Sequence, residues 1–175
     1  MITRAIKGLE DVISCTVVMP IWQRTKPDDP TDEHSGWMFS NPGGTPIRNS
    51  IGLGGPFPSS YHRNDPDPHF GAKSVRELYE CVGQIGGKFT VPILFDKKLK
   101  TIVSNESSEI IQMLDSEFNH LAGSPEIDLQ PDDLKSVMEE VDEWIYTTIN
   151  NGVYRSVDRV FCGGYCICNP SLQQC

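Results

Sequence analysis

The sequence has 175 residues, of which 38% are hydrophobic and 22% are charged, and this composition predicts one soluble domain, or a small domain with part of another. The formal net charge of −9 argues against nucleic acid as a partner, because phosphate contacts need clustered Lys and Arg. No apolar run approaches the ~20 residues of a membrane span, and the N-terminal residues do not read as a secretory signal. We therefore expect a cytoplasmic protein with no membrane partner.

The first part of the chain predicts a helix, a strand and a long loop. Apolar residues recur at helical spacing over residues 2–12, with Gly8 as a turn or helix end. The β-branched run ISCTVVMP, residues 13–20, predicts a buried strand. Residues 24–70 hold eight of the thirteen prolines and predict a long irregular loop.

The remaining elements alternate between helices and strands. An amphipathic helix is predicted over residues 73–82. Two strands, TVPILF and TIVSN, follow around the charged turn DKKLK, and SSEIIQMLDSEFN then predicts a helix from Ser107. A last helix with an apolar stripe is predicted to begin near Pro131 and to stop at Asn151-Gly152. This order predicts an α/β layer with a mixed sheet.

The six cysteines are unevenly distributed. Cys15 and Cys81 stand alone in apolar or helical surroundings, which predicts free, reduced core thiols. The other four form a C-x3-C-x-C-x6-C cluster that matches no standard zinc motif, so no metal site is expected. Residues 157–175 are predicted to form a divergent Cys-rich tail without regular structure.

Two short motifs lie on either side of the predicted strand pair. Pro92 interrupts a strand, and a cis Val91–Pro92 bond would turn the backbone of Val91 toward an extended peptide; an ordinary trans proline at an edge strand is the alternative. Glu106 and Ser107 open a helix, where a serine is an ordinary cap. The free N–H groups of a helix start also bind a carboxylate, and a nearby glutamate suits an ammonium group. This corner could therefore hold an α-amino acid head.

The sequence resembles the Xi-class glutathione transferases, the omega-like glutathionyl-hydroquinone reductases. The motifs that carry the resemblance extend from about Ile2 to Ser156 and are GLEDVISCTVVMP, GWMF, VRELYE, FTVPILFDKKLKTIVSNESSEIIQMLDSEFN and VDEWIYTTINNGVY. The resemblance implies an α/β fold, with a thioredoxin-like glutathione-binding domain over residues 1–122 that lacks its first strand. Residues 131–156 would then form the first helix of an all-α C-terminal domain.

The resemblance also implies a glutathione site. Val91 would pair its backbone with the cysteinyl part of glutathione, and Glu106 and Ser107 would hold the γ-glutamyl head. Trp37 would pack over the peptide, although it could equally be a core aromatic that anchors the loop. Lys88 stands where the family has an arginine for the glycyl carboxylate, and lysine would make a weaker contact. The implied site residues are Trp37, Lys88, Val91, the cis-proline Pro92, Glu106 and Ser107.

The family's reaction needs a cysteine in a Cys-Pro-Trp-Ala motif at a helix N-terminus, where the thiol pKa is lowered. That cysteine takes the glutathione from a glutathionyl-hydroquinone as a mixed disulfide and releases the hydroquinone; a second glutathione then forms oxidised glutathione. The motif does not occur in this sequence. By this resemblance we expect glutathione as co-substrate and quinone- or hydroquinone-type molecules as partners, and a homodimer is possible. We expect no catalytic residue and no activity in the chain as given. The alternatives are a non-catalytic glutathione-binding or protein-interaction module, and a truncated product without a role of its own.

Overall fold

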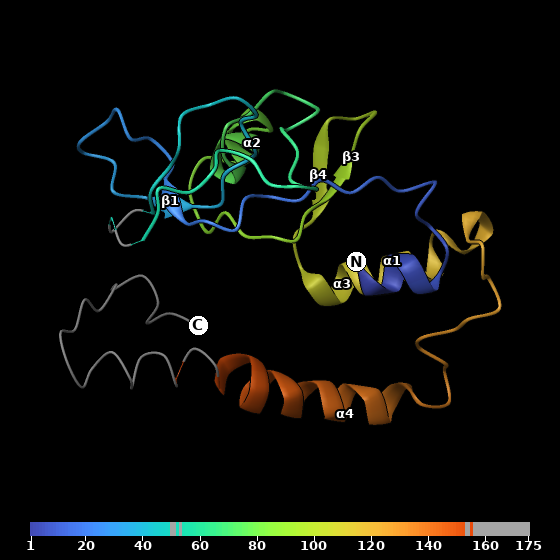
Figure 1. Ribbon diagram of the computed structural model, residues 1–175. Coiled ribbons are helices and arrows are strands. Elements are labelled where there is room, and N and C mark those ends of the chain that lie inside the picture. The colour runs from blue at the N-terminus through green and yellow to red at the C-terminus, as the bar shows by residue number, and fades with distance from the viewer. Residues whose placement is uncertain (50–51, 53, 153–154, 156–175) are drawn as a thin grey trace. The chain divides into compact units, whose positions relative to one another are not determined.

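The structure is a computed structural model and describes residues 1–49, 52, 54–152 and 155 (Figure 1). The chain divides into two compact units, of which the first is Met1–Ile127 and the second begins at Asp128. The described elements of the first unit are the helices α1 (Ile2–Ile6), α2 (Val75–Cys81) and α3 (Ser107–Ser116), the 3-10 helix η1 (Asn119–Leu121), and the strands β1 (Gln23–Arg24), β2 (Ser35–Gly36), β3 (Leu94–Asp96) and β4 (Thr101–Ser104).

The described strands form two separate antiparallel pairs and not the mixed sheet that the element order predicts. In the first pair, β1 lies beside β2. In the second, β3 and β4 form a hairpin in which Leu94 stands opposite Ser104 and Asp96 opposite Thr101, with an irregularity after Leu94. The two predicted strands TVPILF and TIVSN are therefore confirmed as one hairpin, although β3 is shorter than its motif.

The buried strand predicted over residues 13–20 is not formed. A β-branched run becomes a strand only where a neighbouring strand supplies hydrogen-bond partners. Here the carbonyls of Val17 and Val18 accept instead from the side-chain amide of Asn64, at 3.3 and 2.8 Å. The N–H of Met19 donates to the carbonyl of Met38 at 2.8 Å. Isolated hydrogen bonds to distant residues thus replace a strand ladder along this segment.

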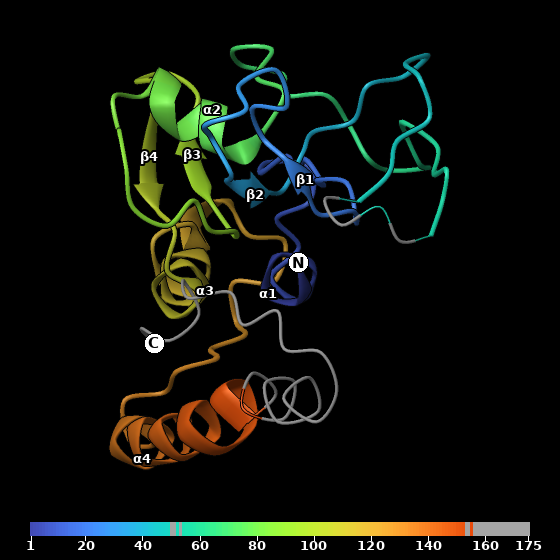
Figure 2. The same ribbon diagram turned by 90° about the vertical axis from the view of Figure 1, so that its left-hand side faces the viewer.

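Helices α1 and α3 lie side by side (Figure 2), and a hydrophobic cluster forms between α3 and the segment that follows α1. Leu9 is fully buried between Ile110 and Leu114 of α3. Gly8 ends the α1 turn with φ +63°, as predicted, and a Cβ at this position would lie only 3.1 Å from the Cα of Gly123. A glycine is therefore required both for its backbone conformation and for the close approach of the two chain segments.

A buried ion pair joins the same two helices. Lys7 is 1% exposed, and its Nζ lies 3.1 Å from the Oδ1 of Asp115 on α3. The same ammonium group donates to the carbonyl of Ile127 at 2.5 Å. These contacts hold the end of α1, the last turn of α3 and the segment after η1 in one arrangement.

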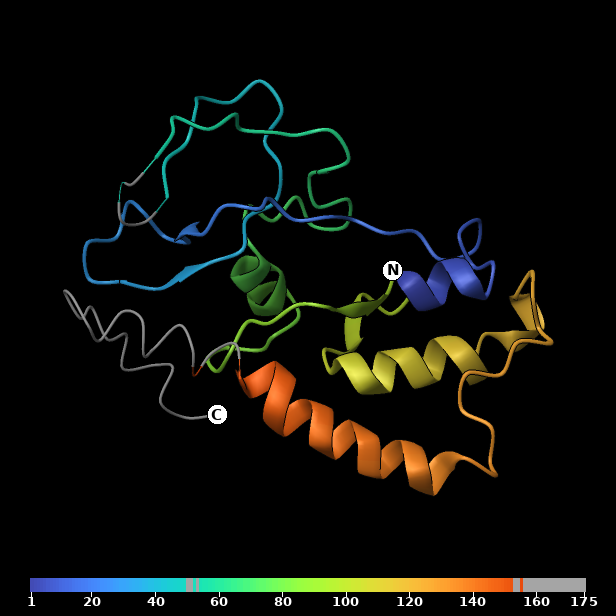
Figure 3. The ribbon, with the colours of Figure 1, turned by 60° about the horizontal axis from the view of Figure 1, so that its bottom comes forward.

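Helix α2 forms as the sequence predicts. Ser74 caps it by accepting the N–H of Glu77 at 3.1 Å, and the carboxylate of Glu77 accepts the N–H of Lys73 at 2.7 Å. Val75, Leu78 and Tyr79 are buried. The long loop predicted before this helix is present, and Figure 3 shows it as a broad excursion between β2 and α2 that extends away from α3.

The second unit contains helix α4 (Lys135–Ile145), which continues into a π-helical turn, η2 (Tyr146–Asn150). The helix begins four residues after the predicted Pro131. The predicted stop at Asn151-Gly152 is wrong, because both residues are still helical; a glycine within a helix costs only about 1 kcal/mol. In η2, the hydroxyl of Thr148 donates back to the carbonyl of Trp144 at 2.6 Å, a contact that competes with the regular helix bonds.

The remaining predictions for this region concern its surface and its tail. The apolar stripe of α4 is exposed in the described unit, with Val137, Val141 and Trp144 between 45 and 60% exposed. The predicted Cys-rich tail, 157–175, lies outside the described residues. Within the part that the structure describes, no helix has the length and apolar character to cross a membrane.

The buried ion pair leads to a test of stability. Replacing Asp115→Asn removes the negative charge from the buried ammonium of Lys7, and we expect a loss of about 3–5 kcal/mol in the free energy of unfolding. Urea unfolding followed by circular dichroism measures it. The exposed Glu126→Gln is the control and should change stability by less than about 0.5 kcal/mol.

The double variant K7M/D115L separates the charge effect from a packing effect. Since it removes both charges together, it should recover most of the stability lost in Asp115→Asn. A double variant that remains as unstable as the single one would show that the ion pair is not the cause.

Candidate functional site

The β3–β4 hairpin brings two of the predicted motifs to the same end of the molecule. Leu94, the first residue of β3, is paired with Ser104, the last residue of β4. Val91 and Pro92 come just before β3, and Glu106 and Ser107 come just after β4, so both motifs stand at the open end of the hairpin. The side-chain amide of Asn105 bridges them by donating to the hydroxyl of Thr90 at 2.9 Å.

The Val91–Pro92 segment leads into β3 and is partly exposed. The Val91–Pro92 bond is cis, as the family resemblance implies. Val91 is 37% exposed, and no strand is described on its outer side. Tyr79 supports this segment from α2, because its hydroxyl donates to the carbonyl of Thr90 at 3.0 Å.

The start of α3 carries an exposed acid beside exposed hydroxyls. Glu106 is the N-cap residue, and its side chain makes no capping hydrogen bond. The helical hydrogen bonds begin with the N–H of Ile110, which donates to the carbonyl of Glu106 at 3.0 Å. The amides of the first turn, from Ser107 to Glu109, therefore precede the helical ladder and form the positive end of the helix dipole.

Hydrogen bonds of the buried Ser104 hydroxyl hold the start of α3 in place. This hydroxyl accepts the N–H of Glu106 at 3.0 Å and donates to the carboxylate of Glu109 at 2.7 Å. The carboxylate of Glu109 is thus engaged with the protein, while that of Glu106 is exposed. The arrangement offers helix amides for a carboxylate and one outward carboxylate for an ammonium group.

The other two predicted site residues, Trp37 and Lys88, belong to other segments of the chain. Trp37 follows β2, is half-buried, and lies edge-on against Trp22 with ring centroids 4.9 Å apart. Its carbonyl accepts the N–H of Val75 at 2.9 Å, which ties it to the start of α2. Lys88 is exposed in the segment between α2 and β3. The structure therefore supports an anchoring contact for Trp37, and it leaves the predicted ligand contacts of both residues as predictions.

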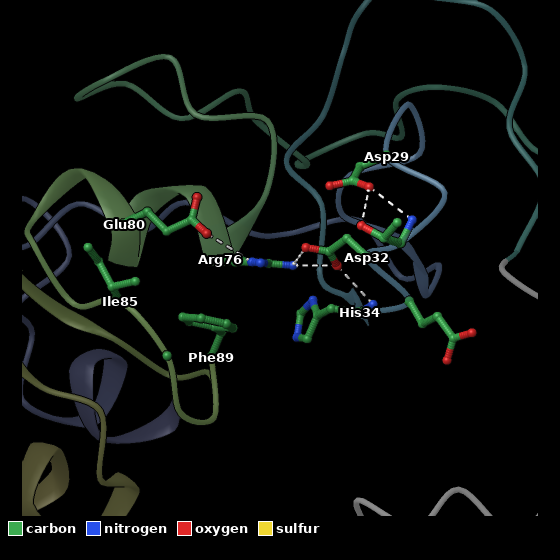
Figure 4. Close-up of a pocket in the computed structure, with 10 residues that line it drawn as sticks. Asp29, Asp32, His34, Arg76, Glu80, Ile85 and Phe89 are labelled. Atoms are coloured by element: carbon green, nitrogen blue, oxygen red, sulfur yellow. Dashed lines mark hydrogen bonds and ion pairs between the residues drawn. The ribbon is translucent and has the colours of Figure 1, made fainter.

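An open pocket of about 450 Å³ lies beside Phe89, between the loop before β2 and helix α2 (Figure 4). Half of its lining residues are charged, and none of the six predicted site residues is among them; the lining residues are Asp29, Thr31, Asp32, Glu33, His34, Arg76, Glu80, Ile85, Gly86 and Phe89.

Arg76 is the centre of this pocket. Its guanidinium group lies 2.6 Å from a carboxylate oxygen of Asp32 and 2.9 Å from Glu80, and Lys26 pairs with the same Glu80 oxygen at 2.9 Å. The hydrogen bond from Arg76 lowers the pKa of Asp32 to about 2. The contact with Lys26, and then that with Arg76, lowers the pKa of Glu80. These ion pairs fasten the loop before β2 to α2.

The two described cysteines are exposed and not core thiols as predicted. Cys15 lies in the segment that fails to form a strand. Cys81 is the last residue of α2, and desolvation together with the carboxylates of Glu77, Asp67 and Glu80 raises the pKa of its thiol. A helix C-terminus and a raised pKa oppose thiolate formation, which is the reverse of what a catalytic cysteine needs.

Several residues that shape the site were not found from the sequence. The i,i+4 pair Arg76–Glu80 within VRELYE is a recognisable helix signal. The contacts of Thr90 with Tyr79 and Asn105 have no local pattern, because each partner comes from a different element. Among the described residues there is no group of three or more side chains that could hold a metal ion.

Searches among known proteins give a consistent result. No family model matches the sequence. The glutathionyl-hydroquinone reductase YqjG of Escherichia coli is 34% identical over 166 residues, which cover 89% of this chain and 39% of that protein. The chain spans less than half the length of the curated relatives that it matches.

Solved structures agree with this relationship. The Xi glutathione transferase of Phanerochaete chrysosporium is 42% identical with a TM-score of 0.66, and the match covers 89% of this chain and 42% of that one. The Xi transferase ECM4 of Saccharomyces cerevisiae, solved with glutathione, is 34% identical with a TM-score of 0.69, covering 87% and 46%. The fold is thus that of a glutathione transferase with a thioredoxin-like N-terminal part, as predicted. The chain belongs to the Xi family of glutathione transferases and glutathionyl-hydroquinone reductases.

The environment of His34 leads to a prediction about pH. Burial of the imidazole, followed by the charge of Arg76, lowers the pKa of His34, whereas Asp32 and Glu80 act in the opposite direction and Lys26 adds to the lowering. The unfolded chain therefore takes up this proton at a higher pH than the folded chain. Stability should fall as the pH drops below about 6.5, the ordinary pKa of histidine.

The thermal midpoint of the unaltered chain, measured at pH 7.5 and 5.5, should show this loss. In His34→Gln the pH-dependent loss should be smaller by on the order of 2 °C. The exposed His120→Gln is the control and should retain the full pH dependence. An identical loss in the His34 variant would show that another group is responsible.

Proposed function

We propose that this chain binds glutathione at the open end of the β3–β4 hairpin. The observation that carries the proposal is the pairing of Leu94 with Ser104, which sets the Val91–Pro92 and Glu106–Ser107 motifs at one end of one hairpin. Two relatives in the same family, YqjG and ECM4, have been solved with glutathione bound. The chain keeps both motifs, and the comparison with these structures covers 87% of it.

The γ-glutamyl head of glutathione fits the start of α3. Its α-carboxylate would accept hydrogen bonds from the first-turn amides and from the hydroxyl of Ser107. Its α-ammonium group would lie against the exposed carboxylate of Glu106. Glu106 is the acid that we assign to the ligand, because it is exposed at the N-cap position and its side chain makes no capping hydrogen bond.

The rest of the peptide extends along Val91. The cis bond to Pro92 leaves the N–H and C=O of Val91 for antiparallel pairing with the cysteinyl residue, in the manner of an added strand. Trp37 would cover the peptide, and Lys88 would attract the glycyl carboxylate through a single ammonium charge. These two contacts add orientation and charge to the backbone pairing.

The reaction that this site serves is glutathionyl-hydroquinone reduction. The proposal is supported by relatives such as YqjG and the PcpF protein of Sphingobium chlorophenolicum, which are glutathionyl-hydroquinone reductases. In that chemistry a protein thiol takes up the glutathionyl group as a disulfide, the hydroquinone leaves, and glutathione regenerates the thiol. Since such chemistry draws on reduced glutathione, we place the protein in the cytoplasm.

The 175-residue chain on its own serves as the glutathione-binding part of this chemistry. Cys81 stands at the wrong end of its helix and has a raised pKa. Cys15 belongs to no helix. Of the two cysteines that the structure describes, Cys81 has surroundings that oppose thiolate formation, and we propose a non-catalytic binding module as the function of the chain by itself.

Glutathione binding is tested by isothermal titration calorimetry. The unaltered chain should bind glutathione, and Glu106→Gln and Ser107→Ala should each weaken binding about 10- to 100-fold, the worth of a charge-assisted hydrogen bond. The control is Ser108→Ala, which removes a neighbouring hydroxyl in the same helix turn and should leave the affinity unchanged. Equal losses in all three variants would assign the effect to the helix and not to these two side chains.

Catalysis is tested separately by chromatography of the hydroquinone product. We expect the 175-residue chain to release no hydroquinone from a glutathionyl-hydroquinone above the rate of glutathione alone. Turnover that disappears in Cys15→Ser or Cys81→Ser would contradict this expectation and would identify the thiol that acts.

A further inference from the structure

Thr90 is the residue at which the two halves of the proposed glutathione site meet. It directly precedes Val91, whose backbone would pair with the ligand. Its hydroxyl accepts the side-chain amide of Asn105 at 2.9 Å, and Asn105 directly precedes Glu106. One hydrogen bond therefore links the peptide-pairing segment to the segment that would hold the γ-glutamyl head.

Thr90 is also held from the opposite side. Its carbonyl accepts the hydroxyl of Tyr79 at 3.0 Å, and Tyr79 is buried in α2. A residue that is fixed by a buried helix through its main chain and by the α3 side through its side chain has little freedom to move. The position of Val91 follows from it, because the two residues share a peptide unit.

The neighbouring Phe89 adds a third restraint on this segment. Its ring lies edge-on to His34 and to Tyr79, with centroid distances of 5.3 and 5.5 Å, and the guanidinium carbon of Arg76 lies 5.7 Å from its centroid. Figure 4 shows the ring beneath Arg76 and beside His34. The segment before Val91 is thus fastened to α2 and to the loop before β2.

We infer that Thr90 is a positioning residue for glutathione, and that its bond to Asn105 sets the distance between the Val91 backbone and the Glu106–Ser107 corner. The inference rests on the proposed function, since it concerns the same site. A tripeptide that contacts both halves binds well only when their spacing is fixed before it arrives. Neither Thr90 nor Asn105 needs to contact the ligand for this effect.

The experiment compares glutathione affinity with thermal stability in matched variants. Thr90→Val keeps the shape of the side chain and loses the acceptor, and Asn105→Ala loses the donor. Each should raise the Kd about fivefold, the worth of one hydrogen bond, with little change in the thermal midpoint. The double variant should be no weaker than either single one, because the two changes remove the same bond.

Two further variants separate positioning from a general effect on the hairpin. Thr90→Ser restores the hydroxyl and should restore the affinity. Thr101→Val makes the same chemical change at an exposed threonine at the far end of the hairpin and should not alter binding. Tyr79→Phe tests the second anchor of Thr90 and should also weaken binding.

The outcomes distinguish the inference from the function on which it rests. If the unaltered chain binds glutathione and Thr90→Val binds equally well, the inference is overturned and the binding site stands. The inference also fails if Thr90→Ser is as weak as Thr90→Val, or if the two single losses add in the double variant. If the unaltered chain does not bind glutathione, the proposed function falls and the inference falls with it.

Discussion

The first unit depends on a charge that water cannot reach. The ammonium group of Lys7 is buried where α1 ends, and Asp115 and the carbonyl of Ile127 are its partners. An unpaired ammonium in such a place would cost several kcal/mol, so α1, α3 and the segment after η1 must come together in one register. The backbone contact between Gly8 and Gly123 sets how closely they approach. The first turn of α3 inherits its position from this arrangement.

The candidate site draws its two halves from different anchors. The Glu106–Ser107 corner depends on α3, and therefore on the buried pair and on the core around Leu114. The Val91 segment depends on α2, through Tyr79 and through the cluster around Arg76. The hairpin and the Thr90–Asn105 bond are the places where these two supports join.

The sequence predicted the elements whose patterns are local. Helices α2 and α3 and the β3–β4 hairpin follow from apolar spacing and a charged turn, and the family motifs identified the cis-proline. The serine expected to cap α3 does not do so, because Glu106 holds the N-cap position and Ser107 is the first helical residue. The strand expected over residues 13–20 was wrong because its pattern reports burial and branching, but a strand also needs a partner, and partners are not written in the segment itself. The role of Asn64 there, and the bridge between Thr90 and Asn105, join residues far apart in the chain. The length of α4 was misjudged because Gly152 is only a weak helix terminator.

Ser104 has a consequence for which molecules the site would accept. Its hydroxyl ties one oxygen of the Glu109 carboxylate to the protein, while the carboxylate of Glu106 stays exposed beside a row of amides. A simple anion such as phosphate or a dicarboxylate would gain the amides but would also meet the like charge of Glu106. A zwitterionic head, by contrast, would satisfy both at once. The start of α3 would therefore select ligands by the arrangement of their charges and not by their total charge. Such a site discriminates by repelling the wrong ligand as much as by attracting the right one.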